Sequence, residues 1–161
     1  MDWNPVNKIN PSVKSEQLAQ CAFFCLLVGK QAEAFLCLLQ LSEQDDAAVQ
    51  YNLALCYITA NEWQTAANYL EKALSSVKKI QVRKSSTAQQ TIAFKILRTI
   101  EAELSNTFPP MPPDFPQLFP EEAQQDITMV LIHVYKKCNL TDKAKMLAAS
   151  LIGESFACLK E

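Results

Sequence analysis

Apolar residues recur every three or four positions along most of this 161-residue chain, which is the spacing of amphipathic helices. Short polar stretches interrupt the pattern, and Asp45 or Asp46 is suited to cap the helix that follows one of them. The pattern predicts helices over about 15–28, 31–41, 47–60, 62–77, 87–105, 121–137 and 141–152. The predicted fold class is therefore all-α, with about seven helices.

Two proline-containing segments depart from this pattern. Residues 1–14 are polar and are predicted to be an extended lead-in to a single helical domain over 15–161. Residues 107–120 hold six prolines, which remove backbone donors and fix φ, so no helix is expected there. The apolar side chains of this segment are expected to pack back on the helices and to occupy part of a groove: Phe108, Phe115, Leu118 and Phe119. The alternative is an exposed polyproline motif that a small aromatic-lined domain binds.

Three of the predicted helix pairs share the same kinds of residue around the turn that joins them. The turns carry Gly29, Asn61 and Asn139, which tolerate the left-handed conformation that ends a helix. An alanine stands five positions after each turn: Ala34, Ala66 and Ala144. A larger side chain stands four positions before each turn: Cys25, Tyr57 and Tyr135. A small residue at a crossing lets two helix axes approach, and a tyrosine fills the gap beside it.

The middle pair carries the residues of the tetratricopeptide repeat, a helix-turn-helix unit of about 34 residues: Leu53, Ala54, Tyr57, Asn61, Trp63, Ala66 and Ala73. The chain thus resembles that family, and the resemblance implies a short, irregular solenoid of helical hairpins with a proline-rich insertion. The turns are 32 and 78 residues apart, which leaves open whether the third hairpin stacks directly on the second. The alternative is a generic antiparallel helical bundle.

The resemblance also implies a concave groove, lined by the first helix of each hairpin, that binds a peptide or helix of a protein partner. The outward positions of these helices are the candidate partner-binding residues: Tyr51, Asn52, Leu55, Thr59, Met129, His133, Lys136 and Lys137. Asn52 matches the asparagine of a clamp for C-terminal carboxylates, but its basic companions are missing, so that ligand is not expected. The apolar helix Phe35–Leu41 is expected to lie between neighbours and is the candidate face for packing against another chain.

Candidate chemistry changes this picture little. Cys21 and Cys25 lie one helical turn apart, but a zinc site would need Cys138 and His133 to converge on them, and core packing explains these thiols better. His133 is the only histidine, and no nucleophile or orienting acid can be assigned to it. We therefore expect no cofactor, no metal and no enzymatic activity.

Composition agrees with a protein-interaction role. The net charge of −2 and the single basic run, from Lys78 to Lys84, give no general attraction for nucleic acid or for acidic membranes. The chain begins without a basic-then-apolar leader, so a cytoplasmic or nuclear location is expected. The predicted function is an adaptor or scaffold, or a subunit of a larger complex. One alternative is a carrier whose cavity is lined by Phe23, Phe24, Leu27 and Phe35, and another is an enzyme of unknown type built around His133.

Overall fold

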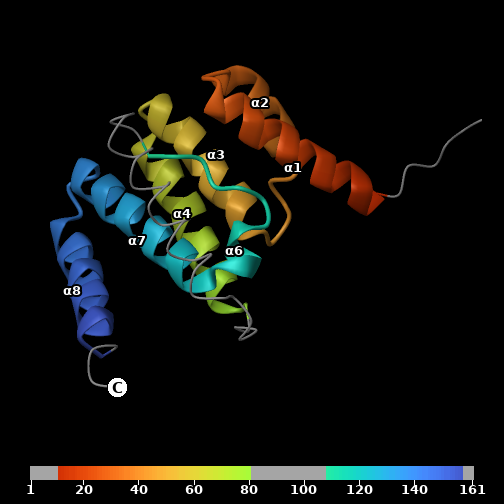
Figure 1. The fold of residues 1–161 in the computed structure, drawn as a ribbon. Coiled ribbons are helices and arrows are strands. Elements are labelled where there is room, and N and C mark those ends of the chain that lie inside the picture. Colours follow the sequence, from red (N-terminus) through yellow and green to blue (C-terminus); the bar gives the residue numbers. More distant parts are fainter. Residues whose placement is uncertain (1–10, 81–107, 158–161) are drawn as a thin grey trace, which may run out of the picture.

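The structure, a computed structural model, describes residues 11–80 and 108–157. All regular structure in these ranges is helical, which confirms the all-α prediction for them (Figure 1). The helices are α1 (Pro11–Leu27), α2 (Gln31–Leu39), α3 (Ala47–Thr59), α4 (Trp63–Lys78), α6 (Phe115–Leu118), α7 (Pro120–Lys137) and α8 (Thr141–Ala157). Most of the extended lead-in and the helix predicted over 87–105 lie outside the described residues.

Four predicted details are wrong, and proline and glycine account for three of them. Helix α1 begins at Pro11 rather than near Ser15, because the first position of a helix needs no backbone donor and suits proline. For the same reason Pro116 is accepted in the short helix α6, inside a segment predicted to have no helix. Gly153 lies within α8 instead of ending it. Helix α2 ends at Leu39, two residues early.

The three predicted turns adopt the left-handed conformation, with φ of 76° at Gly29, 62° at Asn61 and 60° at Asn139. The amide of the residue after each turn donates to a carbonyl five residues earlier: Lys30 to Cys25 at 2.8 Å, Glu62 to Tyr57 at 2.9 Å and Leu140 to Tyr135 at 2.9 Å. This bond satisfies a carbonyl that the end of a helix would leave unpaired. One turn geometry therefore joins α1 to α2, α3 to α4 and α7 to α8.

The alanines after the turns are buried, as the helix crossings require. Ala34 and Ala66 are fully buried and Ala144 is nearly so. Helices therefore pack in the pairs α1–α2, α3–α4 and α7–α8, while α2 contacts α3 and α4 contacts α7 (Figure 1). The α7–α8 pair thus packs directly on the α3–α4 pair through α4 and α7.

The predicted cap of α3 is confirmed at Asp46. Its carboxylate accepts a hydrogen bond from the Val49 amide at 3.0 Å, at the start of the helix.

Tyr135 ties α7 to α4, because its hydroxyl donates a 2.5 Å hydrogen bond to the Glu71 carboxylate. The pKa of Tyr135 is raised well above its usual range, mainly because the side chain is buried and also because its hydroxyl donates to the Glu71 carboxylate. A raised pKa means that this tyrosine stabilises the fold fully below about pH 10 and progressively less as the pH rises through its folded pKa.

We expect Tyr135→Phe to lower the free energy of unfolding by about 2 kcal/mol at pH 7, since a hydrogen bond to a charged group is lost. The difference from wild type should shrink above about pH 10, where the wild-type tyrosine begins to ionise on unfolding. Urea unfolding at both pH values measures the difference. An equal difference at the two pH values would contradict the assigned role.

Candidate peptide groove

A proline-rich segment of the chain itself lies against the middle of the fold. Residues 108–114 cross α3 as irregular backbone before they enter α6 (Figure 1). The Tyr51 hydroxyl donates to the carbonyl of Pro109 at 3.1 Å. The Asn52 side-chain amide donates to the carbonyl of Met111, and its oxygen accepts the amide of Met111, both at 2.8 Å. One side chain of α3 therefore pairs both main-chain groups of a residue about sixty positions away.

Burial makes this pairing important for the fold. Asn52 is 2% exposed and Met111 is fully buried, so neither water nor another segment can replace the two bonds. Phe115 and Pro116 are also buried and anchor the C-terminal side of the segment. The predicted packing of this segment is confirmed for Phe108, Phe115 and Phe119. It is wrong for Leu118, which is 62% exposed.

The eight candidate partner-binding residues lie in three different settings. Tyr51, Asn52 and Leu55 are buried within the chain. Tyr51 and Asn52 hydrogen-bond the main chain of Pro109 and Met111, so a partner would contact these two side chains only if residues 108–114 moved away. The hydroxyl of the exposed Thr59 donates back to the Leu55 carbonyl at 3.0 Å. The other residues form a stripe along α7, in which His133 is partly buried and the rest are exposed: Met129, His133, Lys136 and Lys137.

His133 lies among aromatic rings and cations. Its ring centroid is 5.2 Å from that of Phe108 and 6.2 Å from that of Trp63. The Lys137 ammonium lies 5.7 Å from the centre of the Trp63 ring. Burial, followed by the charges of Lys137 and Lys136, lowers the pKa of His133, so its imidazole is neutral at pH 7. Among the described residues, the charged groups that act on this histidine are lysines, whereas a catalytic histidine usually needs an orienting carboxylate.

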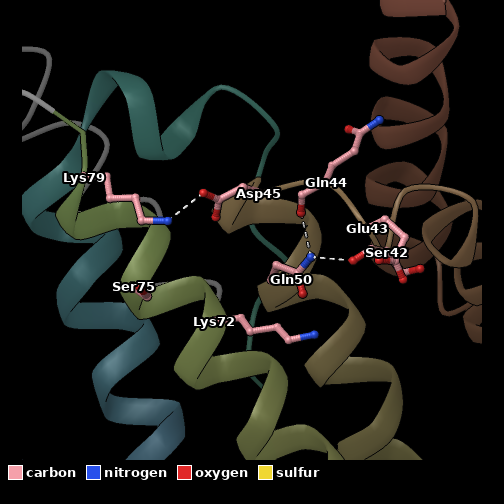
Figure 2. Close-up of a pocket in the computed structure, with 8 residues that line it drawn as sticks. All are labelled: Ser42, Glu43, Gln44, Asp45, Gln50, Lys72, Ser75 and Lys79. Atoms are coloured by element: carbon pink, nitrogen blue, oxygen red, sulfur yellow. Dashed lines mark hydrogen bonds and ion pairs between the residues drawn. The ribbon is translucent and has the colours of Figure 1, made fainter.

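A second, polar site lies beside the loop between α2 and α3. A depression of about 260 Å³ is open to solvent there. Figure 2 shows the residues that line it: Ser42, Glu43, Gln44, Asp45, Gln50, Lys72, Ser75 and Lys79. The buried Gln50 side chain donates to the carbonyls of Ser42 at 2.9 Å and Gln44 at 2.8 Å. Gln50 therefore holds the loop against the first turns of α3.

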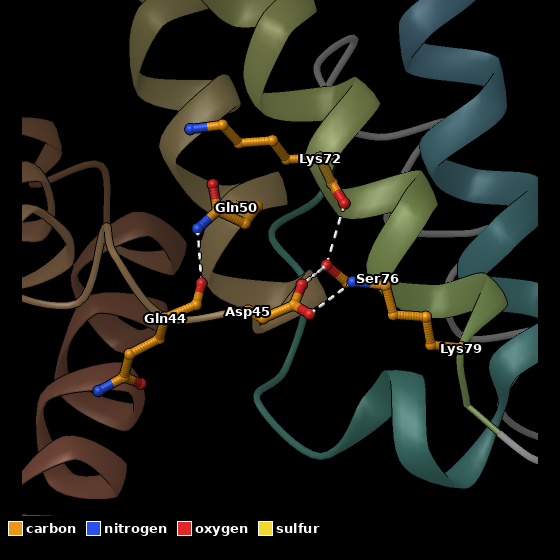
Figure 3. Close-up of polar contacts among 6 residues, drawn as sticks. All are labelled: Gln44, Asp45, Gln50, Lys72, Ser76 and Lys79. Atoms are coloured by element: carbon orange, nitrogen blue, oxygen red, sulfur yellow. Dashed lines mark hydrogen bonds and ion pairs between the residues drawn. The ribbon is translucent and has the colours of Figure 1, made fainter.

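Asp45 fastens the same loop to the end of α4 (Figure 3). Its carboxylate pairs with the Lys79 ammonium at 2.8 Å and accepts a hydrogen bond from the Ser76 hydroxyl. The hydrogen bond from Lys79 lowers the pKa of the Asp45 carboxyl most, and the hydrogen bond from Ser76 lowers it further. Because both oxygens are engaged, the depression is better described as a joint between helix pairs than as a reaction site. Helical periodicity gives no signal for such loop contacts.

We expect Gln50→Ala to lower the free energy of unfolding by about 1–2 kcal/mol, because two loop carbonyls lose their donor. Gln64→Ala, an exposed position of α4, is the matched control and should be neutral within about 0.5 kcal/mol. Chemical denaturation compares the two variants with wild type. Equal effects of both substitutions would mean that Gln50 does not hold the loop.

The first helix pair and its turn carry five exposed apolar side chains, here named together the α1–α2 apolar surface: Phe24, Leu27, Val28, Leu36 and Leu39. Phe24 is 54% and Leu36 is 63% exposed. The prediction that the second helix lies between neighbours on most sides is therefore wrong for its outer side, whereas Ala34 and Leu38 face inward. Because Phe24 and Leu27 point outward, the four side chains named for a ligand carrier do not enclose a cavity.

Two further expectations concern metals and membranes. Within residues 11–80 and 108–157, no three His, Cys, Asp or Glu side chains are grouped so that they could hold a metal ion. In the same ranges no helix has the length and apolar character that a bilayer span requires.

Comparison of the sequence with protein-family models and with curated proteins finds no match, and comparison of the chain with solved structures finds none either.

Proposed function

We propose that this chain is a tetratricopeptide-like protein-interaction module, which binds an extended segment or a helix of a partner as an adaptor, a scaffold or a subunit of a larger complex. The observation that carries the proposal is the way α3 holds residues 108–114. Asn52 contacts the main chain of Met111, and Met111 is fully buried in the hydrophobic core. Main-chain contacts that give affinity, with pockets that give specificity, are how grooves bind extended peptides.

The composition of the bound segment supports the same proposal. Prolines on both sides of Met111 favour the extended polyproline conformation, so little conformational entropy is lost when the segment is held. A partner segment with the same features would meet the same contacts. The repeated turn geometry and the buried alanines support the tetratricopeptide-like description.

Two exposed faces are further candidates for partner contact. The α7 stripe presents Met129 together with Lys136 and Lys137, a combination suited to an acidic segment with an apolar residue. The α1–α2 apolar surface is suited to a partner helix with an apolar face. A cytoplasmic or nuclear location is part of the proposal.

A peptide supplied in trans tests whether the groove is a peptide-binding site. Met111→Asp puts a carboxylate at a fully buried position and should expel the chain's own segment. A dye-labelled peptide with the sequence of residues 108–118 should then bind this variant, as measured by fluorescence anisotropy, and Asn52→Ala in addition should abolish binding.

The matched control is Leu118→Asp, because Leu118 belongs to the same segment but is exposed. This variant should keep its own segment in place and should not bind the peptide. Circular dichroism establishes that each variant is helical. A helical Met111→Asp variant that does not bind the peptide would contradict the proposal.

Charge reversal of Lys136 and Lys137 should weaken capture of the partner at least about tenfold if the α7 stripe is part of the interface, because opposite charges across an interface become like charges. The partner is the protein that wild type retains from a native extract. Lys78→Glu with Lys145→Glu, at exposed positions of α4 and α8, makes the same change in net charge. If both double variants capture the partner equally, the stripe is not the interface.

A further inference from the structure

The cysteines of the first helix pair gather at one level of the α1–α2 hairpin. Cys21 lies eight residues before the turn residue Gly29, and Cys37 lies eight residues after it. Helices α1 and α2 pack side by side across this turn (Figure 1). Because the two positions are equally far from the turn, they come level with each other along the paired helices. Cys21 also acts on the other two thiols: after burial, it is the neighbour that most raises the pKa of Cys37 and of Cys25.

Apolar side chains occupy the equivalent positions of the other two helix pairs. Eight residues on either side of the turn stand Leu53 and Tyr69 in the second pair, and Leu131 and Leu147 in the third. Each of these pairs belongs to one apolar cluster. The positions eight residues before and after the turn therefore hold two apolar side chains of one cluster in the second and third helix pairs, but two cysteines in the first pair.

We propose that Cys21 and Cys37 form a reversible disulfide bond when the chain meets a peroxide, which makes the α1–α2 hairpin a site of thiol modification. Cys21 is exposed and is the thiol that an oxidant reaches first. Its thiolate attacks the peroxide, becomes a sulfenic acid and releases water. The Cys37 thiolate then attacks that sulfur and forms the S–S bond, and a second water leaves. The two thiols give up two electrons and two protons, and the peroxide is reduced to two waters.

Cys25 is the less suitable partner for Cys21, although its thiol is also close. Residues four positions apart on one helix have Cβ atoms about 5–6 Å apart. A disulfide bond requires a Cβ separation of about 3.5–4.5 Å, which α1 would reach only by unwinding. Cys37 is on a separate helix and has no such restriction. Cys25 therefore provides a control in the same surroundings.

The bond would have a structural consequence. It closes the chain between residues 21 and 37 and so restricts the unfolded state, which raises the melting temperature of the oxidised form. The pKa of Cys37 is raised, mainly because its thiol is partly buried and also because Cys21 is its neighbour. Attack by Cys37 is therefore slow at neutral pH, and the oxidation is best followed at about pH 8.5, where the thiolate is more abundant.

The test treats the reduced full-length chain with a small excess of hydrogen peroxide and records its intact mass. Wild type and Cys25→Ser should lose the mass of two hydrogen atoms, and dithiothreitol should restore it. Cys21→Ser and Cys37→Ser should show no such loss, and only oxidised wild type and Cys25→Ser should melt at a higher temperature. Circular dichroism establishes that the serine variants are folded. The proposal is overturned if Cys37→Ser still loses two hydrogens, or if wild type gains only oxygen atoms.

Discussion

Asn52→Ala is expected to lower the free energy of unfolding by about 2–4 kcal/mol, because it leaves a buried amide and a buried carbonyl of Met111 without partners. Neither group can turn to water, since Met111 is fully buried and Asn52 is nearly so. Alanine also leaves space where the amide stood. Urea unfolding followed by circular dichroism measures the change.

Asn68→Ala provides the matched control, because Asn68 lies on the exposed side of α4. The same substitution there should change stability by no more than about 0.5 kcal/mol. Equal small effects at both positions would mean that the α3 contact with residue 111 contributes little to the fold, and the peptide-groove interpretation would lose its main support.

Ala66→Leu should destabilise the fold by about 1–3 kcal/mol, because the larger side chain pushes α3 and α4 apart at their crossing. Ala66 is fully buried one turn into α4, and its neighbour Ala67 is fully buried too, so no empty space can receive a leucine. The melting temperature and the unfolding free energy should both fall.

Ala149→Leu is the comparison that separates packing from helix preference, since Ala149 is exposed on α8 and leucine is also a strong helix former. We expect that variant to be nearly as stable as wild type. A stable Ala66→Leu variant would show that the two helices do not approach closely at this alanine, and the repeated alanines would then need another explanation.

Sequence alone predicted the parts of the fold that local chemistry determines. Asn61 and Asn139 could be assigned to left-handed turns because few residues accept positive φ, and Ala66 to a crossing because helical spacing fixes which face it occupies. The start of α1 at Pro11 and the passage of α8 through Gly153 could not be predicted, because one proline or glycine fits more than one role.

The candidate site was predictable only in part, because its occupant comes from a distant segment. The resemblance to the tetratricopeptide repeat implied that Tyr51 and Asn52 face a groove, and the apolar residues of the proline segment suggested that this segment packs on the helices. No periodicity pairs Asn52 with Met111, which is 59 positions away. The Asp45 contact with α4 was missed for the same reason, because loop positions depend on tertiary packing.

Exchange of the Met111 amide hydrogen tests most directly whether the groove of α3 holds an extended segment. The two residues on either side of Met111, residues 109, 110, 112 and 113, are prolines without an amide hydrogen, so the signal of Met111 stands apart. We expect this hydrogen to exchange as slowly as those in the middle of α3, and to exchange much faster in Asn52→Ala. Exchange in the wild-type protein at the rate of an unfolded peptide would contradict the account.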